Sequence, residues 1–427
     1  MSNMWTFSFV LVAIIAEVYS RYIPDFDTTR RLQVEKGRYV EIKLELYMPF
    51  DSPGAPCADE EYLEIRDGYN QSGNLLGVFC GMYVRINLRS SGQNMWLRFS
   101  SNHRYRLSYH RSYEGKALNA RVPTNLKNVA KTQFVLLNHL SSLWCPAEGG
   151  PAPRIVWKKS GVVVQNSTSV RLQINVTEEE RNTNYSCEVD DHGQLKNINL
   201  IVEKCPQQCQ CKVLKGNMKN LVSADCGTKQ LTSIPEKIPR ATGKLTLSNN
   251  KLKHLPKEVF SRNSNLIKLD LSNNQLQDLP AGVFAGIKVS EWGRLTLDLS
   301  NNQLKNLSSG VFTGISVSQD ASLSLDLSNN QLQDLPPGVF AGIRVSNWVT
   351  LTLDLSHNQL KNLSSEVFSG IYLPRYYYLT LDLSHNQLQD LPPGVFSSLD
   401  FLERLFSAVC SPQEQLLSEL SYDMKIL

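Results

Sequence analysis

The C-terminal half of this chain repeats one pattern, Leu-x-Leu-Asp-Leu-Ser-x-Asn-Gln-Leu, at nearly constant spacing. A fixed period of this length is the signature of a solenoid. One repeat cannot bury its leucines alone, so neighbouring repeats must stack to form one continuous core. The serine of the pattern advances by one step of 24 residues and then four steps of 28, and stands at Ser248, Ser272, Ser300, Ser328, Ser356 and Ser384.

Two ladders of identical side chains are expected to hold the stacked repeats together. Alternating leucines such as Leu295, Leu297 and Leu299 point into the core, and the residues between them point outward. One ladder is made of asparagines that satisfy backbone groups where the chain leaves each strand: Asn250, Asn274, Asn302, Asn330, Asn358 and Asn386. The other is made of phenylalanines beneath the convex side: Phe260, Phe284, Phe312, Phe340, Phe368 and Phe396.

The outward strand positions form the concave face, which is where solenoids commonly bind. We predict that the ligand-binding residues are an aspartate row with hydroxyl neighbours: Asp270, Asp298, Asp326, Asp354, Asp382, Thr296, Thr352 and Thr380. One interpretation is a docking strip for a basic or regularly repeating ligand. The other is recent copying of a 56-residue unit, because Gln-Leu-Lys-Asn-Leu-Ser-Ser occurs at 303 and 359, and Gln-Leu-Gln-Asp-Leu-Pro at 275, 331 and 387.

Two histidines, His357 and His385, occupy the same slot in adjacent repeats, near Asp354 and Asp382. Imidazole and carboxylate groups together can hold zinc. Histidine on a repeat is more often simply a surface residue, and we favour that interpretation. We expect no metal, no cofactor and no nucleic-acid partner.

The chain has the features of a secreted protein. An apolar run from Trp5 to Ala16 followed by Val18-Tyr-Ser20 predicts a signal peptide over residues 1–20, cleaved before Arg21. The run is too short to span a ~30 Å bilayer, and no later stretch approaches that length. Nine cysteines fit an oxidising pathway. Six Asn-x-Ser/Thr sequons predict N-glycosylation, at Asn70, Asn166, Asn175, Asn184, Asn306 and Asn362.

Residues 21–116 alternate apolar side chains with glycine punctuation, which is typical of antiparallel strands. The segments Cys57-Ala-Asp-Glu-Glu-Tyr-Leu-Glu-Ile-Arg-Asp-Gly68, Leu76-Gly-Val-Phe-Cys80-Gly81 and Met95-Trp-Leu-Arg-Phe-Ser-Ser101 resemble a CUB domain, an extracellular β-sandwich. The resemblance implies a Cys57–Cys80 disulfide, and the family's usual earlier cysteine pair is absent. At the family's calcium site Glu61 and Asn102 stand nearest to the ligand positions, and the amide carries no charge for calcium.

Residues 85–116 hold seven basic residues against one acid. Clustered arginine favours sulfate and carboxylate groups, so an acidic glycan is one candidate partner. The alternative, which we favour, is a solvated strand face balanced by residues 21–83, where 7 basic residues face 11 acidic ones. The candidate polyanion-binding residues are Arg98, Arg104, Arg106 and Arg111.

Residues 122–203 contain Cys145, Trp157 and Tyr185-Ser-Cys187. This spacing is that of an immunoglobulin-like sandwich, with one cysteine on each sheet, a tryptophan on the bridge and a tyrosine two residues before the second cysteine. Three of the sequons lie in this segment. If they carry sugar, a spacer role is favoured.

Residues 205–240 begin with Cys205-Pro-Gln-Gln-Cys209-Gln-Cys211, followed by Cys226. They resemble the N-terminal cystine cap of extracellular leucine-rich repeat proteins, which implies the pairs Cys205–Cys211 and Cys209–Cys226. Four clustered cysteines are also compatible with zinc, but thiols in a secreted protein oxidise.

Residues 241–405 form six repeats that resemble those of Slit-like guidance proteins, Toll-type receptors and the variable lymphocyte receptors of jawless fish. In these families the array usually ends in a second cystine cap, whereas here only Cys410 follows, in a C-terminal tail of residues 406–427. Cys410 is the ninth, odd cysteine, so a disulfide-linked dimer through it is one prediction. A second interpretation of the tail is that the chain is a shortened form of a cell-surface receptor.

The resulting fold prediction is two all-β sandwiches, CUB-like and immunoglobulin-like, followed by a leucine-rich repeat α/β solenoid with a parallel concave sheet. Sequence motifs for hydrolases, metalloproteases and phosphate-binding loops are absent, so we expect a binding protein and not an enzyme. The expected partner is an extracellular protein or cell-surface ligand, in adhesion or guidance. The alternatives are recognition of microbial surfaces in innate immunity and inhibition of an extracellular enzyme.

Overall fold

A computed structural model describes residues 28–47, 62–79, 84–100, 110–118, 122–126, 129–150, 153–189, 193–214, 220–289, 293–318, 321–345, 349–371, 378–396, 399, 402–406 and 425–426. The chain divides into two compact units. The first is drawn from residues 1–132, 143–172 and 183–199, and the second from 133–142, 173–182 and 200–427. The predicted signal peptide lies outside the described residues.

The first sandwich packs two antiparallel sheets around one apolar core. Because side chains alternate along a strand, Val40 and Ile42 of one sheet pack against Leu63 and Ile65 of the other. One sheet has the order β1-β6-β3-β4 and the other β5-β2-β7. The strands are β1 (Thr28–Gln33), β2 (Tyr39–Tyr47), β3 (Tyr62–Asp67), β4 (Asn74–Phe79), β5 (Val84–Arg89), β6 (Asn94–Ser100) and β7 (His110–Leu118).

The segment 122–203 forms a five-stranded sheet of order β13-β12-β15-β16-β9 and two-stranded sheets β10-β14 and β11-β8. A disulfide joins Cys145, which follows β10, to Cys187 in β15. Trp157 is fully buried and Tyr185 is 2% exposed. The elements are β8 (Val122–Asn125), β9 (Thr132–Leu136), β10 (Leu140–Trp144), β11 (Glu148–Gly150), β12 (Ile155–Lys159), β13 (Val162–Ser167), β14 (Arg171–Asn175), the 3-10 helix η1 (Glu178–Asn182), β15 (Tyr185–Val189) and β16 (Gln194–Glu203).

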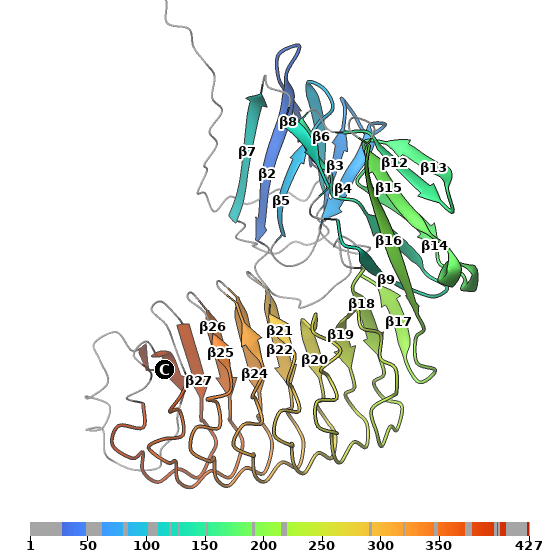
Figure 1. Ribbon diagram of the computed structural model, residues 1–427. Coiled ribbons are helices and arrows are strands. Elements are labelled where there is room, and N and C mark those ends of the chain that lie inside the picture. The colour runs from blue at the N-terminus through green and yellow to red at the C-terminus, as the bar shows by residue number, and fades with distance from the viewer. Residues whose placement is uncertain are drawn as a thin grey trace, which may run out of the picture. The chain divides into compact units, whose positions relative to one another are not determined.

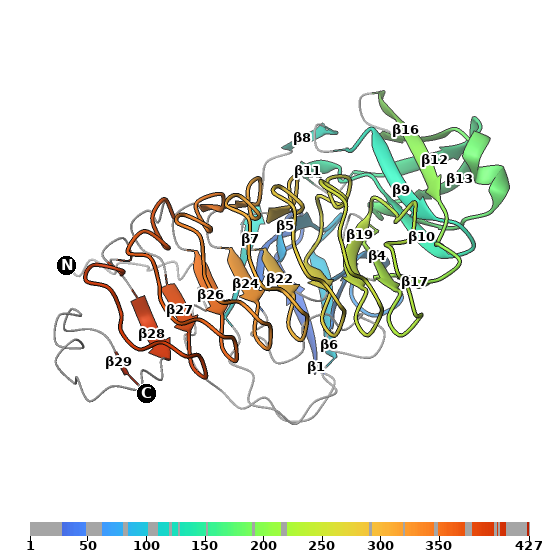
Figure 2. The same ribbon diagram turned by 90° about the horizontal axis from the view of Figure 1, so that it is seen from below.

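The solenoid is built on a ten-stranded sheet (Figures 1 and 2). Six of its strands come from the six successive repeats, two precede them in the cap, and two follow them. The first pair is antiparallel and the pairs that follow are parallel. Its strands are, in order, β17 (Gln210–Val213), β18 (Val222–Asp225), β19 (Thr242–Thr246), β20 (Lys268–Asp270), β22 (Arg294–Asp298), β24 (Ser322–Asp326), β26 (Thr350–Asp354), β27 (Tyr378–Asp382), β28 (Leu402–Phe406) and β29 (Lys425–Ile426).

The asparagine ladder ties each repeat to the one before it. Asn302 Nδ2 donates to the carbonyl oxygens of Leu271 in the preceding repeat and of Leu299 in its own, both at 3.0 Å. Its Oδ1 accepts from the N–H of Leu276 at 3.0 Å. The side chain is 7% exposed. Nδ2 also donates to the carbonyl oxygen of Ser300 at 3.1 Å. Since buried backbone groups need partners, this one amide side chain satisfies four of them.

The phenylalanine ladder is a continuous stack. Ring centroids of successive members from Phe260 to Phe396 lie 5.7–6.0 Å apart. Each neighbouring pair among the first five rings is within 10° of parallel, whereas the planes of Phe368 and Phe396 differ by 25°. The regular inner stack shows that the repeats are close copies in space as well as in sequence.

The described part of the solenoid contains no α-helix, so the helical half of the α/β prediction is not found there. Turns occupy the convex side, together with a small parallel sheet of β21 (Lys288–Val289), β23 (Ser316–Val317) and β25 (Arg344–Val345). Residues with positive φ interrupt the convex segments, as at Glu258 (55°), Gly310 (85°) and Gly314 (91°). Where two such glycines lie four residues apart, the run between them is too short to nucleate a helix.

Candidate binding face of the solenoid

The predicted aspartate row lies in register on the ten-stranded sheet. Backbone pairing aligns Asp270 with Asp298, and the alignment continues through Asp326 and Asp354 to Asp382. A second column, of hydroxyl residues, aligns Thr296, Ser324, Thr352 and Thr380. Both columns alternate with buried leucines, so they lie on the outer face of the sheet, which we call the Asp face.

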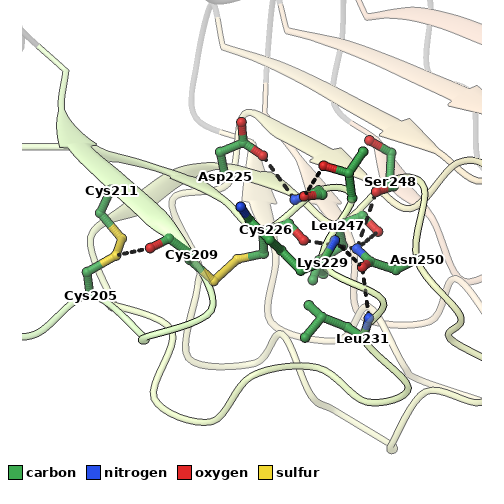
Figure 3. The surroundings of a disulfide bond; sticks show 12 residues. Cys205, Cys209, Cys211, Asp225, Cys226, Lys229, Leu231, Leu247, Ser248 and Asn250 are labelled. Carbon is green, nitrogen blue, oxygen red and sulfur yellow. Dashed lines mark hydrogen bonds between the residues drawn. A yellow bond between two sulfur atoms is a disulfide. The ribbon is translucent and has the colours of Figure 1, made fainter.

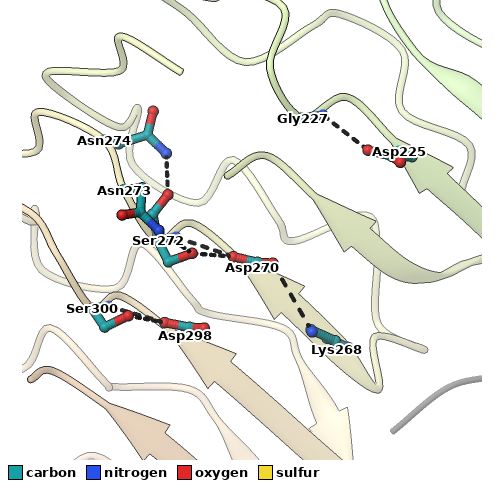
Figure 4. A network of polar contacts seen from close by, with 9 residues as sticks. All are labelled: Asp225, Gly227, Lys268, Asp270, Ser272, Asn273, Asn274, Asp298 and Ser300. Carbon is teal, nitrogen blue, oxygen red and sulfur yellow. Dashed lines mark hydrogen bonds and ion pairs between the residues drawn. The ribbon is translucent and has the colours of Figure 1, made fainter. Parts of the chain in front are cut away.

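Each aspartate of the row also holds the turn that follows its strand. Asp298 Oδ1 accepts from the N–H of Ser300 at 3.0 Å and from its Oγ at 2.7 Å, and Asp270 bonds Ser272 in the same way (Figure 4). The backbone bond recurs at Asp326, Asp354 and Asp382. The spacing Asp-x-Ser is typical of an Asx turn. The Asp-x-Ser spacing carries this signal in the sequence itself, in addition to the alternation that predicts the row.

Burial and repulsion by its neighbours act on Asp326 at the centre of the row. Desolvation raises the pKa of Asp326, and the neighbouring carboxylates Asp298 and Asp354 raise it further. Hydrogen bonds from Ser328 oppose the shift. Burial disfavours the charged form of a carboxyl group, as do like charges nearby.

The row has defined ends, and basic residues stand beside its start. In the first repeat Thr246 occupies the register position of the aspartates, and after the last repeat Phe406 does so. Lys244 and Lys268 stand in register with the hydroxyl column. Lys268 Nζ lies 4.0 Å from Asp270 Oδ2. These two lysines belong to the Asp face, although the sequence analysis did not include them.

The two histidines stack on each other, with ring centroids 4.1 Å apart and planes within 13°. Both are exposed and both have a positive φ of 54°. Asn301 and Asn329 hold the same slot with the same conformation, which asparagine and histidine adopt more readily than most residues. Among the described residues no group of three or more His, Cys, Asp or Glu could hold a metal ion.

Disulfides close the cap in front of the first repeat. Cys205 is joined to Cys211 and Cys209 to Cys226, the pairing that the resemblance implies (Figure 3). Cys226 is fully buried, and its carbonyl oxygen accepts from Asn250 Nδ2 at 2.9 Å. The cap is thus joined directly to the first member of the asparagine ladder. Cys57, Cys80 and Cys410 lie outside the described residues.

Little of the candidate polyanion patch can be placed. Arg104 and Arg106 lie outside the described residues, as do Glu61 and Asn102 of the calcium prediction, and the side chain of Arg111 is likewise not described. Arg98 is half-buried and pairs across the strands with Glu64. Arg89 of the same basic segment forms an ion pair with Glu41 at 2.8 Å. Both interpretations of the basic segment therefore stay predictions.

All six predicted glycosylation asparagines are described and exposed: Asn70, Asn166, Asn175, Asn184, Asn306 and Asn362. Exposure of the folded side chain is compatible with attached sugar. In the part of the chain that the structure describes, no helix is long and apolar enough to cross a membrane.

Comparison with known proteins gives independent matches in both halves of the chain. The CUB domain model matches residues 14–113, and leucine-rich repeat models match residues 242–292, 323–343 and 379–399. Cubilin of Sus scrofa is 33% identical over 95 residues, which is 22% of this chain and 2% of that protein. Cubilin of Homo sapiens is 30% identical over 100 residues, 23% of this chain and 3% of that protein.

A bone morphogenetic protein 1 homolog of Strongylocentrotus purpuratus is 30% identical over 95 residues, 22% of this chain and 14% of that protein. The chain thus spans only a small fraction of the relatives it matches. The cubilin matches support the first domain alone. Taken with the sandwich and the stacked repeats, the matches establish that this chain contains an N-terminal CUB domain and a C-terminal array of leucine-rich repeats.

Proposed function

We propose that this protein is a secreted or cell-surface recognition protein that binds an extracellular protein through the Asp face, in adhesion or guidance. CUB and leucine-rich repeat domains indicate an extracellular protein-interaction role. The observation that carries the finer proposal is the in-register row of five half-buried carboxylates beside a hydroxyl column. Such a face offers regularly spaced acceptors to a basic partner.

We assign supporting roles to the two N-terminal modules. The buried Trp157 beside the Cys145–Cys187 bridge, with Tyr185 two residues before the second cysteine, supports an immunoglobulin-like second domain. Three exposed sequons on this domain favour a spacer over a reader. For the CUB domain an acidic glycan remains the candidate partner, through its basic segment. Cys410 remains the candidate for a disulfide-linked dimer.

The test replaces three charges at the centre of the Asp face. A variant with Asp298, Asp326 and Asp354 all changed to Asn keeps an oxygen for each Ser N–H, so the turns and the fold should persist. Binding to the partner should weaken and its salt dependence should flatten. The matched control changes Asp278, Asp334 and Asp390, three exposed aspartates of the same array, to Asn. Equal affinity of both variants would contradict a role for the Asp face.

The partner itself is found by binding the labelled full chain to host cells and to bacteria in parallel, with the fragment 205–427 as a second probe. Saturable binding to host cells that the fragment shares supports the proposal. Binding to bacteria alone would replace it with microbial recognition in innate immunity. Binding to neither, with capture of a purified soluble enzyme, would replace it with enzyme inhibition.

A further inference from the structure

A hollow of about 510 Å³ lies on one edge of the solenoid, across three consecutive repeats. Its volume falls in the ~300–1,000 Å³ range of sites that take small molecules. Asn306 and Asn362, both predicted to carry sugar, line it from the two outer repeats, and Asp334 lines it from the middle repeat. Both asparagines are exposed, as is Asp334.

The middle repeat gives the hollow an apolar wall. Pro336 and Pro337 line it there, together with Leu335, whereas the flanking repeats carry serines at the two proline positions. Pro337 is exposed and Pro336 half-buried. The C–H faces of a sugar ring pack on such apolar surface, and the carboxylate of Asp334 can accept from sugar hydroxyl or N-acetyl N–H groups.

The 56-residue period explains why the hollow has a sequon on both sides. Repeats alternate between Asn-Leu-Ser and Asp-Leu-Pro, so an Asp-type repeat within the array can be flanked by two Asn-type repeats. Only Asp334 has both: Asp278 has Asn306 on one side and His254 on the other, and Asp390 follows Asn362 in the last repeat. The hollow is therefore a product of the order of the repeats.

We propose that the N-linked glycans of Asn306 and Asn362 seat their first sugars in this hollow, against Pro336 and Pro337, so that the chain's own carbohydrate covers this edge of the solenoid. In the attachment step the amide nitrogen of asparagine bonds to the anomeric carbon of the sugar. The bond from that carbon to a lipid-linked diphosphate donor breaks, and the amide loses one proton. The proposal does not depend on which partner the Asp face binds.

The experiment uses the full chain secreted from eukaryotic cells. Peptide mass spectrometry first measures sugar occupancy at each sequon, and a peptide N-glycosidase then releases the sugars from the native protein. Sugars of Asn306 and Asn362 that pack in the hollow should be released at least about fivefold more slowly than the sugar of Asn175. This factor is what the burial of a small apolar contact contributes to an equilibrium. After denaturation the rates should become equal. Absence of sugar from Asn306 or Asn362, or equal native rates, would overturn the proposal.

A matched pair of variants tests the seat itself. Pro337→Ala removes the exposed ring from the hollow, and alanine already stands at the equivalent Ala281. It should raise native release at both asparagines severalfold, toward the Asn175 rate. Pro393→Ala makes the same change in the last repeat, outside the hollow lining, and should leave both rates unchanged. Unchanged rates in Pro337→Ala, or equal acceleration in the two variants, would show that the prolines are not the seat.

Discussion

The side chain of Asn220 bonds both backbone groups of Ser142: Nδ2 donates to the carbonyl oxygen at 2.7 Å, and Oδ1 accepts from the N–H at 3.1 Å. Nδ2 also donates to the carbonyl oxygen of Phe134 at 3.1 Å. Asn220 is 5% exposed and has a φ of 47°. Within the second unit, this one amide joins Ser142 of β10 and Phe134 of β9 to the repeat cap.

Replacement of Asn220 by alanine should therefore destabilise the second unit by about 2–4 kcal/mol. Three backbone groups would lose their partner in a buried place, and alanine tolerates a positive φ poorly. Chemical denaturation measures the change. Asn220→Gly separates the two causes, because glycine keeps the conformation and loses only the bonds. If both variants unfold like the unchanged chain, the bonds contribute no net stability.

Removal of one inner ring of the phenylalanine stack should cost more than removal of the last. Phe312 is fully buried between two parallel neighbours, so Phe312→Ala should lower the free energy of unfolding by about 3–5 kcal/mol. Phe396 is only partly buried and has one stacking neighbour, and its alanine variant should lose clearly less. Denaturant titration of both variants decides the order. Equal losses would contradict the importance of stacking on both faces.

A glycine at position 258 should stabilise the array by about 1 kcal/mol. Glu258 has a φ of 55°, and the equivalent residues of the next two repeats, Gly282 and Gly310, also have a positive φ. This conformation costs free energy for any residue other than glycine. The ion pair of Glu258 with Lys257 is exposed and contributes little. Glu366 holds the same slot without a positive φ. Glu366→Gly should therefore destabilise, and thermal melts of the two variants should shift in opposite directions.

Asp326→Asn should stabilise the fold at neutral pH and have little effect at a pH below the ordinary pKa of an aspartate. The pKa of Asp326 is raised by burial and then by its two carboxylate neighbours. The folded state therefore binds a proton more tightly than the unfolded state, and stability falls as the pH rises from the unfolded pKa through the folded one. Melting temperatures at several pH values test this. Asp390→Asn, on an exposed residue of the same array, is the control.

The 28-residue period was enough to predict the solenoid, because only stacked repeats bury the leucines at those positions. It also predicted the ladders of Asn302 and Phe312. Inside a repeat the amide needs backbone hydrogen-bond partners and the ring needs apolar neighbours, and both come from the adjacent repeat. The α/β character of the predicted solenoid is unconfirmed, because the described residues of the repeats contain no α-helix. Gly310 and Gly314 have positive φ values there, which an α-helix does not use.

The Asp face was predicted by alternation, but the role of its side chains was not. Asp298 serves as a turn acceptor because Ser300 follows two residues later, a local relationship hidden by the wider repeat. The contacts of Asn220 could not be predicted, since 78 residues separate it from Ser142 and no periodicity connects the two. The Cys205–Cys211 and Cys209–Cys226 bridges were implied by resemblance alone.

The phenylalanine stack repeats once per repeat, whereas the alternation of Asn306, Asp334 and Asn362 repeats once per two repeats. The structural unit of the array is therefore two repeats long. Inserting or deleting one 56-residue unit preserves the ring stack, the asparagine ladder and the order of sugar-bearing and proline-bearing repeats. A one-repeat change preserves the first two and breaks the third. The length of this protein's sheet can therefore change in steps of two strands, ~10 Å at a time, without redesign of either end.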